Sequence, residues 1–148
     1  MRDMVEQLQF TAVPPSALRI VWRDVEPMLA KAIKKSGGYY NTAVVLDGVC
    51  SGALGLWIVL DDTKPIAAIT TRIDKMPNAT VLVMDWIGGT RMKEWLPMAQ
   101  NTLERYADDN GCTQLHGFGR KGWDRFLRHH GWKPDHIVYK MELSNGQG

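Results

Sequence analysis

Apolar residues recur at helical spacing in the segment between Pro14-Pro15 and Gly37-Gly38. This spacing predicts an amphipathic helix. Pro27 lies inside the stripe and lacks a backbone N–H, so we expect the helix to kink or to split there. A second, short helix is predicted to start at Asn41 or Thr42, which are good N-cap residues, and to end near Ser51. The apolar positions of the first helix are Leu18, Val21, Trp22, Val25, Met28, Leu29, Ala32 and Ile33.

The next part of the chain predicts three consecutive strands, Ala53–Leu60, Ile66–Ile73 and Ala79–Ile87. Short turns around Pro65 and Pro77 separate them, which indicates an antiparallel arrangement. The strands carry apolar residues at odd and even positions alike. A strand of this kind is buried on both faces, so we expect helices to cover both sides of the sheet.

A strand–glycine–helix unit follows. We expect Gly88-Gly89 to end the third of these strands. An amphipathic helix should begin near Met92–Glu94, because Pro97 is tolerated only in a first turn, and should end at Asn110-Gly111. Cys112–Gly117 then predicts another strand. Since a helix separates the two strands, they should lie parallel to each other, joined by a crossover.

Three further elements complete the expected order. Gln7–Val13 predicts a short first strand, Arg120–His130 a short helix, and the alternation over Ile137–Leu143 a final strand. The fold class is therefore α/β of mixed α+β type, with a mostly antiparallel sheet, one parallel pair and helices on both faces. Residues 1–143 are expected to form a single domain and residues 144–148 a disordered tail.

Charge and cysteine content limit the ligands and the location that we expect. The formal net charge is only +2, so attraction to nucleic acid requires a local basic patch. Cys50 and Cys112 fit no metal-ligand spacing, and we expect two reduced, packed thiols and no metal. The charged start of the chain has no signal peptide pattern and no apolar run is long enough for a bilayer, which favours a cytoplasmic protein.

This order of elements, with Gly88-Gly89 before the long helix, resembles the GNAT superfamily of N-acetyltransferases from about Gln7 to Leu143. The resemblance implies an N-acyltransferase that uses acetyl-CoA or another acyl-CoA and a small-molecule or protein amine. The stretches Asp85–Gly89 and Gly119–Trp123, with Trp95-Leu96 and Gly111-Cys112, are also similar to small GNAT-like proteins of tailed bacteriophages. That similarity implies phage structural proteins as partners, and a location in the host cytoplasm or the virion.

The turn after Ile87 is the first candidate site, formed by Gly88, Gly89, Thr90 and Arg91. Glycines allow close approach of a ligand to the backbone, and the start of a helix attracts phosphate. The resemblance places the pyrophosphate of coenzyme A here. The family loop reads Gln/Arg-x-x-Gly-x-Gly/Ala, however, and this turn departs from it. A tight turn without a ligand is an equal alternative.

Asp85 is the second candidate, because a carboxylate is unusual in the apolar run before it. The resemblance implies a general base that deprotonates an amine. The alternative, which we favour, is an aspartate at the end of the strand that forms a salt bridge or caps the next helix.

The helix Arg120–His130 provides the third candidate. Arg120 and Lys121 are expected to contact the phosphates of the coenzyme, and Arg125, Arg128 and His129 extend the basic face. A solvated face is the commoner explanation, and nucleic-acid binding is a weaker one. In the family, a tyrosine on this helix protonates the leaving thiolate, but Leu127 stands at that position here.

Two functions of different classes therefore remain open. One is an acyl-CoA-dependent N-acyltransferase, or a descendant of one, in which Asp85 is the base. The other is a non-catalytic phage protein that keeps the fold for binding, in the virion or in particle assembly. The altered loop and missing tyrosine favour the second, whereas the glycine turn and Asp85 favour the first.

Overall fold

A computed structural model of the chain describes residues 8–119 and 121–144. It divides into two compact units, Met1–Phe118 and Gly119–Gly148. Each unit is described by itself below. The expectation of a single domain over residues 1–143 stays a prediction.

The first unit contains a five-stranded sheet whose strands follow one another in chain order. Adjacent strands from β1 to β4 pair antiparallel, and β4 pairs with β5 in parallel. The mixed sheet with one parallel pair is thus confirmed, as is the crossover between its last two strands. The strands are β1 (Leu8–Ala12), β2 (Gly55–Asp61), β3 (Lys64–Met76), β4 (Ala79–Gly89) and β5 (Gln114–Gly117).

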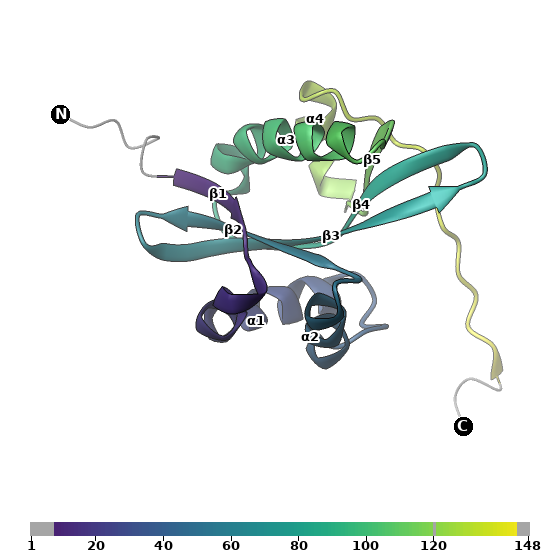
Figure 1. Cartoon of the computed structure of the whole chain (residues 1–148). Helices are drawn as coiled ribbons and strands as arrows, with labels where there is room; N and C mark the ends of the chain where they lie inside the picture. Colours follow the sequence, from purple (N-terminus) through teal and green to yellow (C-terminus); the bar gives the residue numbers. More distant parts are fainter. Residues whose placement is uncertain (1–7, 120, 145–148) are drawn as a thin grey trace. The chain divides into compact units, whose positions relative to one another are not determined.

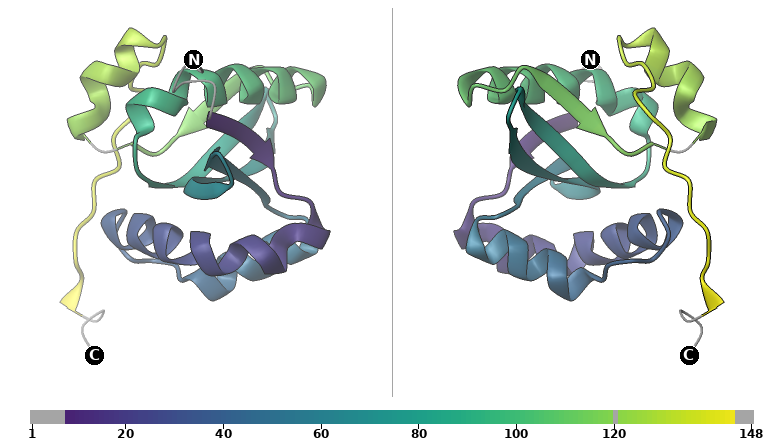
Figure 2. Two further views of the ribbon diagram at one scale, coloured as in Figure 1. Left: turned by 90° about the vertical axis from the view of Figure 1, so that its left-hand side faces the viewer. Right: turned by 90° about the vertical axis from the view of Figure 1, so that its right-hand side faces the viewer.

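Helices cover both faces of this sheet (Figure 1; Figure 2). A short 3-10 turn, η2 (Pro15–Ala17), leads into α1 (Leu18–Lys35), which lies on one face together with α2 (Thr42–Ser51). Helix α3 (Met92–Asp109) lies on the other face. The predicted N-cap of α2 is confirmed: the Oδ1 atom of Asn41 accepts the backbone N–H of Val44 at 3.0 Å.

Helix α1 runs through Pro27 without ending, so of the two expected outcomes, a kink or a split, the split is wrong. Val25 and Leu29, on either side of the proline, are completely buried and anchor both halves of the helix in one core. Pro27 itself is exposed. The carbonyl group that loses its partner can therefore be hydrated, which lowers the cost of the missing hydrogen bond.

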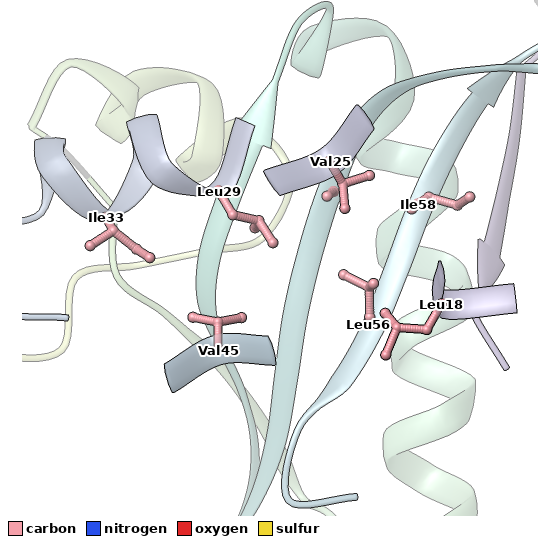
Figure 3. Packing of buried hydrophobic residues seen from close by; sticks show 8 residues of the cluster. Leu18, Val25, Leu29, Ile33, Val45, Leu56 and Ile58 are labelled. Carbon is pink, nitrogen blue, oxygen red and sulfur yellow. The ribbon is translucent and has the colours of Figure 1, made fainter. Parts of the chain in front are cut away.

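The core between α1, α2 and the sheet is a cluster of aliphatic side chains (Figure 3). Along β2, Leu56 and Ile58 belong to this cluster. Trp57, on the opposite face, stacks on Phe10 and meets Tyr106 of α3 edge to face, with ring centroids 5.3 and 5.1 Å apart. The strand is apolar on both sides because each side packs against helices, as the sequence predicts. The cluster consists of Leu18, Val25, Leu29, Ile33, Val45, Leu56, Ile58 and Ala68.

The second unit contains a 3-10 turn, η3 (Lys121–Trp123), and a short helix, α4 (Asp124–His129). The predicted strand over Ile137–Leu143 is wrong, since these residues form no strand. Alternating side chains favour a strand only where another strand accepts its backbone hydrogen bonds, and this segment pairs with no strand among the described residues. Its apolar side chains remain exposed, Tyr139 at 88%.

Two smaller expectations concern the cysteines and the membrane. Cys112 is buried, as expected, but Cys50 is exposed in the last turn of α2, so the expected packing of both thiols is wrong for Cys50. Only one side of α2 faces the core, through Val45, and Cys50 lies off that side. Within residues 8–119 and 121–144, no helix is both long and apolar enough to cross a membrane.

Candidate functional site

A β-bulge in β4 places Asp85 out of register with the neighbouring strand. Thr70 of β3 lies opposite Trp86 and Thr71 lies opposite Met84, so Asp85 is an extra residue without a partner. A bulge bends a strand and redirects its side chains. The hydroxyl of Thr70, which is fully buried, accepts the backbone N–H of Trp86 at 3.3 Å. The side chain of Thr70 thus provides the hydrogen-bond acceptor for a backbone N–H group next to the bulge.

Strand β4 loses its parallel partner at the same point. Its pairing with β5 runs from Val81 opposite Gln114 to Met84 opposite Gly117 and then stops. Residues 86–89 continue to pair with β3, but no other strand of the described chain joins the second edge of residues 85–89. The carboxyl end of β4 therefore offers unpaired backbone groups to an extended ligand, beside the start of the crossover helix.

Asp85 forms a two-point ion pair with Arg72 of β3. The Nε and Nη2 atoms of Arg72 donate to its two carboxylate oxygens at 2.7 and 3.3 Å. Only 13% of the Asp85 side chain is exposed. The pKa of Arg72 is raised, chiefly by this hydrogen bond, and Asp74 lies 3.6 Å away as a second anionic neighbour. The salt bridge is as expected, but Asp85 lies inside the strand and caps no helix.

The two glycines of the candidate turn are required by packing. Both belong to β4, where Gly88 pairs with Ala68 and Gly89 with Ala67, so the strand ends two residues later than the expected Ile87. A Cβ atom on Gly88 would lie 2.3 Å from the carbonyl oxygen of Met28 in α1. Gly89 has a φ of +119°, and a Cβ there would lie 2.3 Å from the carbonyl oxygen of Ile66. The glycines alone are therefore no sign of a ligand.

Arg91 is held by two carboxylates at the start of α3. Its Nε and Nη2 atoms donate to Glu94 at 2.8 and 3.0 Å, and its Nη1 atom donates to Asp61 at 2.6 Å. These hydrogen bonds, that to Glu94 first, raise the pKa of Arg91. Arg91 also has a φ of +61°, which is uncommon for a residue with a side chain. The guanidinium thus fixes the turn between β4 and α3 to the end of β2.

An aromatic pair lies next to the bulge. Trp86 directly follows Asp85 and packs against the α1–α2 core cluster. Tyr40, in the connection between α1 and α2, meets the Trp86 ring edge to face with centroids 5.3 Å apart. Tyr40 remains 57% exposed. Aromatic surface accessible to a ligand therefore adjoins the Asp85–Arg72 pair.

The second unit holds the remaining predicted residues. Arg120 lies outside the described residues, and Lys121 is exposed in η3. On α4, Nε of Arg128 donates to Asp124 at 2.7 Å, which neutralises part of the basic face.

His116 is a further side chain with the chemistry of a metal ligand or a proton carrier. The imidazole of His116, on β5, hydrogen-bonds Gln114 at 2.9 Å and is half-buried. In the described part of the chain, no three His, Cys, Asp or Glu residues are grouped to hold a metal ion.

Sequence reasoning missed three residues of this region: Arg72, Asp61 and Tyr40. A signal for Arg72 was present, because it is the one charged residue of the predicted strand Ile66–Ile73 and Asp85 is the one charged residue of the predicted strand Ala79–Ile87. Buried or half-buried charges need partners, so the two could have been paired. Asp61 and Tyr40 lie in or next to turns, and no periodicity indicates what they contact.

Comparison with known proteins extends this picture. No protein-family model matches the chain, and no curated protein matches it. Solved structures do match over nearly its whole length. A probable acetyltransferase aligns with a TM-score of 0.69 at 9% identity, covering 92% of this chain and 98% of that one. A possible acetyltransferase from Clostridium difficile 630 aligns with a TM-score of 0.65 at 13% identity, covering 93% and 98%.

A third match is an aminoglycoside N-acetyltransferase, AAC(6')-Iy, solved in complex with coenzyme A. Its TM-score is 0.64 at 14% identity, with 91% of this chain and 94% of that chain covered. At these identities the likeness shows the fold alone, and the chain has the fold of the GNAT acetyltransferases. The similarity to small phage proteins stays a prediction.

Proposed function

We propose that this protein is an N-acyltransferase that moves an acyl group from acyl-CoA to an amine. The observation that carries the proposal is the half-paired strand β4. Its pairing with β5 ends at Met84, and the bulge with the half-buried Asp85 follows immediately. An open backbone edge, a carboxylate and a helix start thus occur within a few residues, in a fold shared with acetyltransferases.

In the proposed reaction, the nitrogen lone pair of the amine attacks the thioester carbonyl carbon. A C–N bond forms, the C–S bond breaks, and the thiolate of coenzyme A leaves. The amine gives up one proton, which Asp85 accepts directly or through one water molecule. Since Leu127 occupies the place where the family resemblance puts a tyrosine, the thiolate takes its proton from solvent.

The coenzyme would be held mainly by backbone. The open edge from Asp85 through Ile87 to Gly89 suits the extended arm of the coenzyme. Its pyrophosphate would lie at Thr90 and the first turn of α3, where helix N–H groups have no helical partner. Arg91 would fix that turn rather than bind phosphate, because Glu94 and Asp61 already occupy its guanidinium. Arg120 and Lys121 remain proposed phosphate contacts.

A second candidate is a non-catalytic binding protein with the same fold. The specific observation in its favour is that packing and ion pairing explain Gly88, Gly89 and Arg91 without any ligand. A phage structural protein would be one such binding protein. This candidate predicts a stable fold that forms no acylated product.

The experiment that separates the two is an acyl-transfer assay with acetyl-CoA and a panel of primary amines. Release of free thiol is followed continuously, and the acetylated amine is identified by mass spectrometry. The acyltransferase proposal predicts thiol release that depends on both the protein and the amine. Thiol release that is the same without amine, with no acetylated product, would support the non-catalytic candidate.

A further inference from the structure

We propose that the acceptor of this protein is a cationic amine that keeps a second positive charge after its reacting nitrogen has lost a proton. This class comprises small diamines and polyamines. The inference deepens the proposed function, on which it rests, by naming the substrate class. It is carried by the surroundings of Asp85, namely the rings of Tyr40 and Trp86 and the charges of Arg72 and Asp74.

The aromatic pair provides the first part of the argument. Trp86 and Tyr40 lie with ring centroids 5.3 Å apart at an interplanar angle of 67°. Tyr40 remains 57% exposed although it packs on Trp86. The faces of aromatic rings attract ammonium groups, and the attraction increases where water is partly excluded. The connection between α1 and α2 thus brings a cation-binding surface to the residue next to Asp85.

The charge balance provides the second part. Arg72 lies against both Asp85 and Asp74, at 2.7 and 3.6 Å. One cation faces two anions, so this cluster carries a formal charge of −1. An acceptor with its own carboxylate would be repelled, whereas an acceptor with an extra ammonium group would be attracted.

The chemistry of acyl transfer explains why a second charge is needed. The attacking nitrogen must be neutral, because a protonated amine has no lone pair. A monoamine therefore loses its attraction to the anionic cluster and the rings at the moment of attack. A diamine keeps one ammonium group in place throughout the reaction, so its binding energy remains available to hold the acceptor.

The test uses three acceptors of similar length: 1,4-diaminobutane, n-butylamine and 5-aminopentanoate. Binding of each to the wild-type protein is measured by calorimetry without coenzyme, and KM and kcat are measured with acetyl-CoA. We expect the diamine to bind at least about 10-fold more tightly than the other two, because two attractive contributions add. Equal affinities for the three acceptors, or no binding of the diamine, would overturn the inference.

Tyr40→Leu tests the role of the aromatic pair, since it keeps apolar volume and removes the ring. We expect it to weaken diamine binding roughly 2- to 30-fold, the range of a cation–aromatic contact. KM should rise while kcat changes little, because the contact holds in the ground state and in the transition state alike. The matched control is Tyr39→Leu: the Tyr39 ring lies over Gly37, and its loss should leave diamine affinity unchanged.

The outcomes also separate this inference from the proposed function. Selective diamine binding that is sensitive to Tyr40→Leu, without acyl transfer, would uphold the acceptor site and contradict the enzyme. Acyl transfer to n-butylamine and 1,4-diaminobutane with equal kcat/KM would uphold the enzyme and overturn the acceptor class. Equal effects of Tyr40→Leu and Tyr39→Leu would likewise overturn the role of the aromatic pair.

Discussion

The two halves of strand β4 have different environments although they are continuous in the chain. Val81–Met84 pairs with β3 on one edge and β5 on the other, and its four side chains are buried. Asp85–Gly89 pairs with β3 alone, carries a bulge, and is half-buried or exposed. The first half holds the sheet together, whereas the second half leaves backbone and a carboxylate accessible.

The difference shows how one strand can provide both stability and a site. Binding groups are most precise when a rigid element positions them. The buried half fixes the direction of β4, and the bulge then turns Asp85 toward Arg72. If this division is correct, substitutions in the first half should affect stability, and substitutions in the second half should affect function or local packing.

The largest expected effect is that of Asp85→Asn on turnover. Loss of a general base should lower kcat by roughly 10²–10⁴-fold, while coenzyme binding is nearly unchanged. The comparison variant is Asp74→Asn. Asp74 also faces Arg72 but is 44% exposed, and as a member of the anionic cluster its loss should raise KM for a diamine while kcat stays nearly unchanged. Steady-state kinetics measure kcat and KM for both variants. An equal loss of kcat in both variants, or no loss of kcat in either, would contradict the role of Asp85 as the general base.

Substitutions in the buried half of β4, Val81–Met84, should lower the stability of the protein. Leu82 is completely buried, and Leu82→Ala should lower the free energy of unfolding by about 2–5 kcal/mol through lost contacts and a cavity. Ile87→Ala, in the half-buried second half, should cost clearly less. Urea denaturation of both variants measures the difference. Equal losses would contradict the division of the strand.

Gly88→Ala should destabilise the fold by about 1–3 kcal/mol, because the added Cβ meets the backbone of α1 and one of the two elements must move. Thermal unfolding provides the measurement. Gly122→Ala is the control, since a Cβ at Gly122 meets no atom within 4 Å. A Gly88→Ala variant as stable as the wild type would contradict the packing role of this glycine.

The smallest expected effect is on the pH dependence of stability, through the ion pair between Arg91 and Glu94. The pKa of Glu94 is lowered from its ordinary value of 4.5, chiefly by the hydrogen bond from Arg91. A carboxyl group whose pKa is lower in the folded state contributes stability above its unfolded pKa and loses it as the pH falls through the folded pKa. Glu94→Gln should therefore lose less melting temperature than the wild type when the pH is lowered from about 6 to about 3. If the melting temperatures of the two proteins fall equally with pH, the ion pair between Arg91 and Glu94 adds no stability.

Much of the fold could be predicted because local patterns dictate it. Helical spacing, turn residues and apolar strands gave the order of elements through β5 and the parallel pair. The errors arose where tertiary contacts decide. Helix α1 continues through Pro27 because buried residues anchor both sides of it. Ile137–Leu143 alternates like a strand, but alternation does not provide a pairing partner.

The candidate site was predicted less completely. The sequence singles out Asp85 as an unusual carboxylate, but the bulge at Asp85 depends on the register between β3 and β4. The sequence predicts a ligand or a tight turn at Gly88 and Gly89, but it does not indicate their packing role, since the clash of a Cβ at Gly88 with Met28 involves a helix 60 residues earlier in the chain. Contacts of this kind have no local signature.

The measurement that tests the central claim most directly is calorimetric titration of the protein with coenzyme A, accompanied by thermal unfolding. The open half of β4 and the start of α3 predict saturable binding. At about a hundred times the dissociation constant, the ligand should raise the free energy of unfolding by about 2.7 kcal/mol. Absence of both heat and a melting shift at millimolar coenzyme A would contradict the claim that this half of the strand is a coenzyme site.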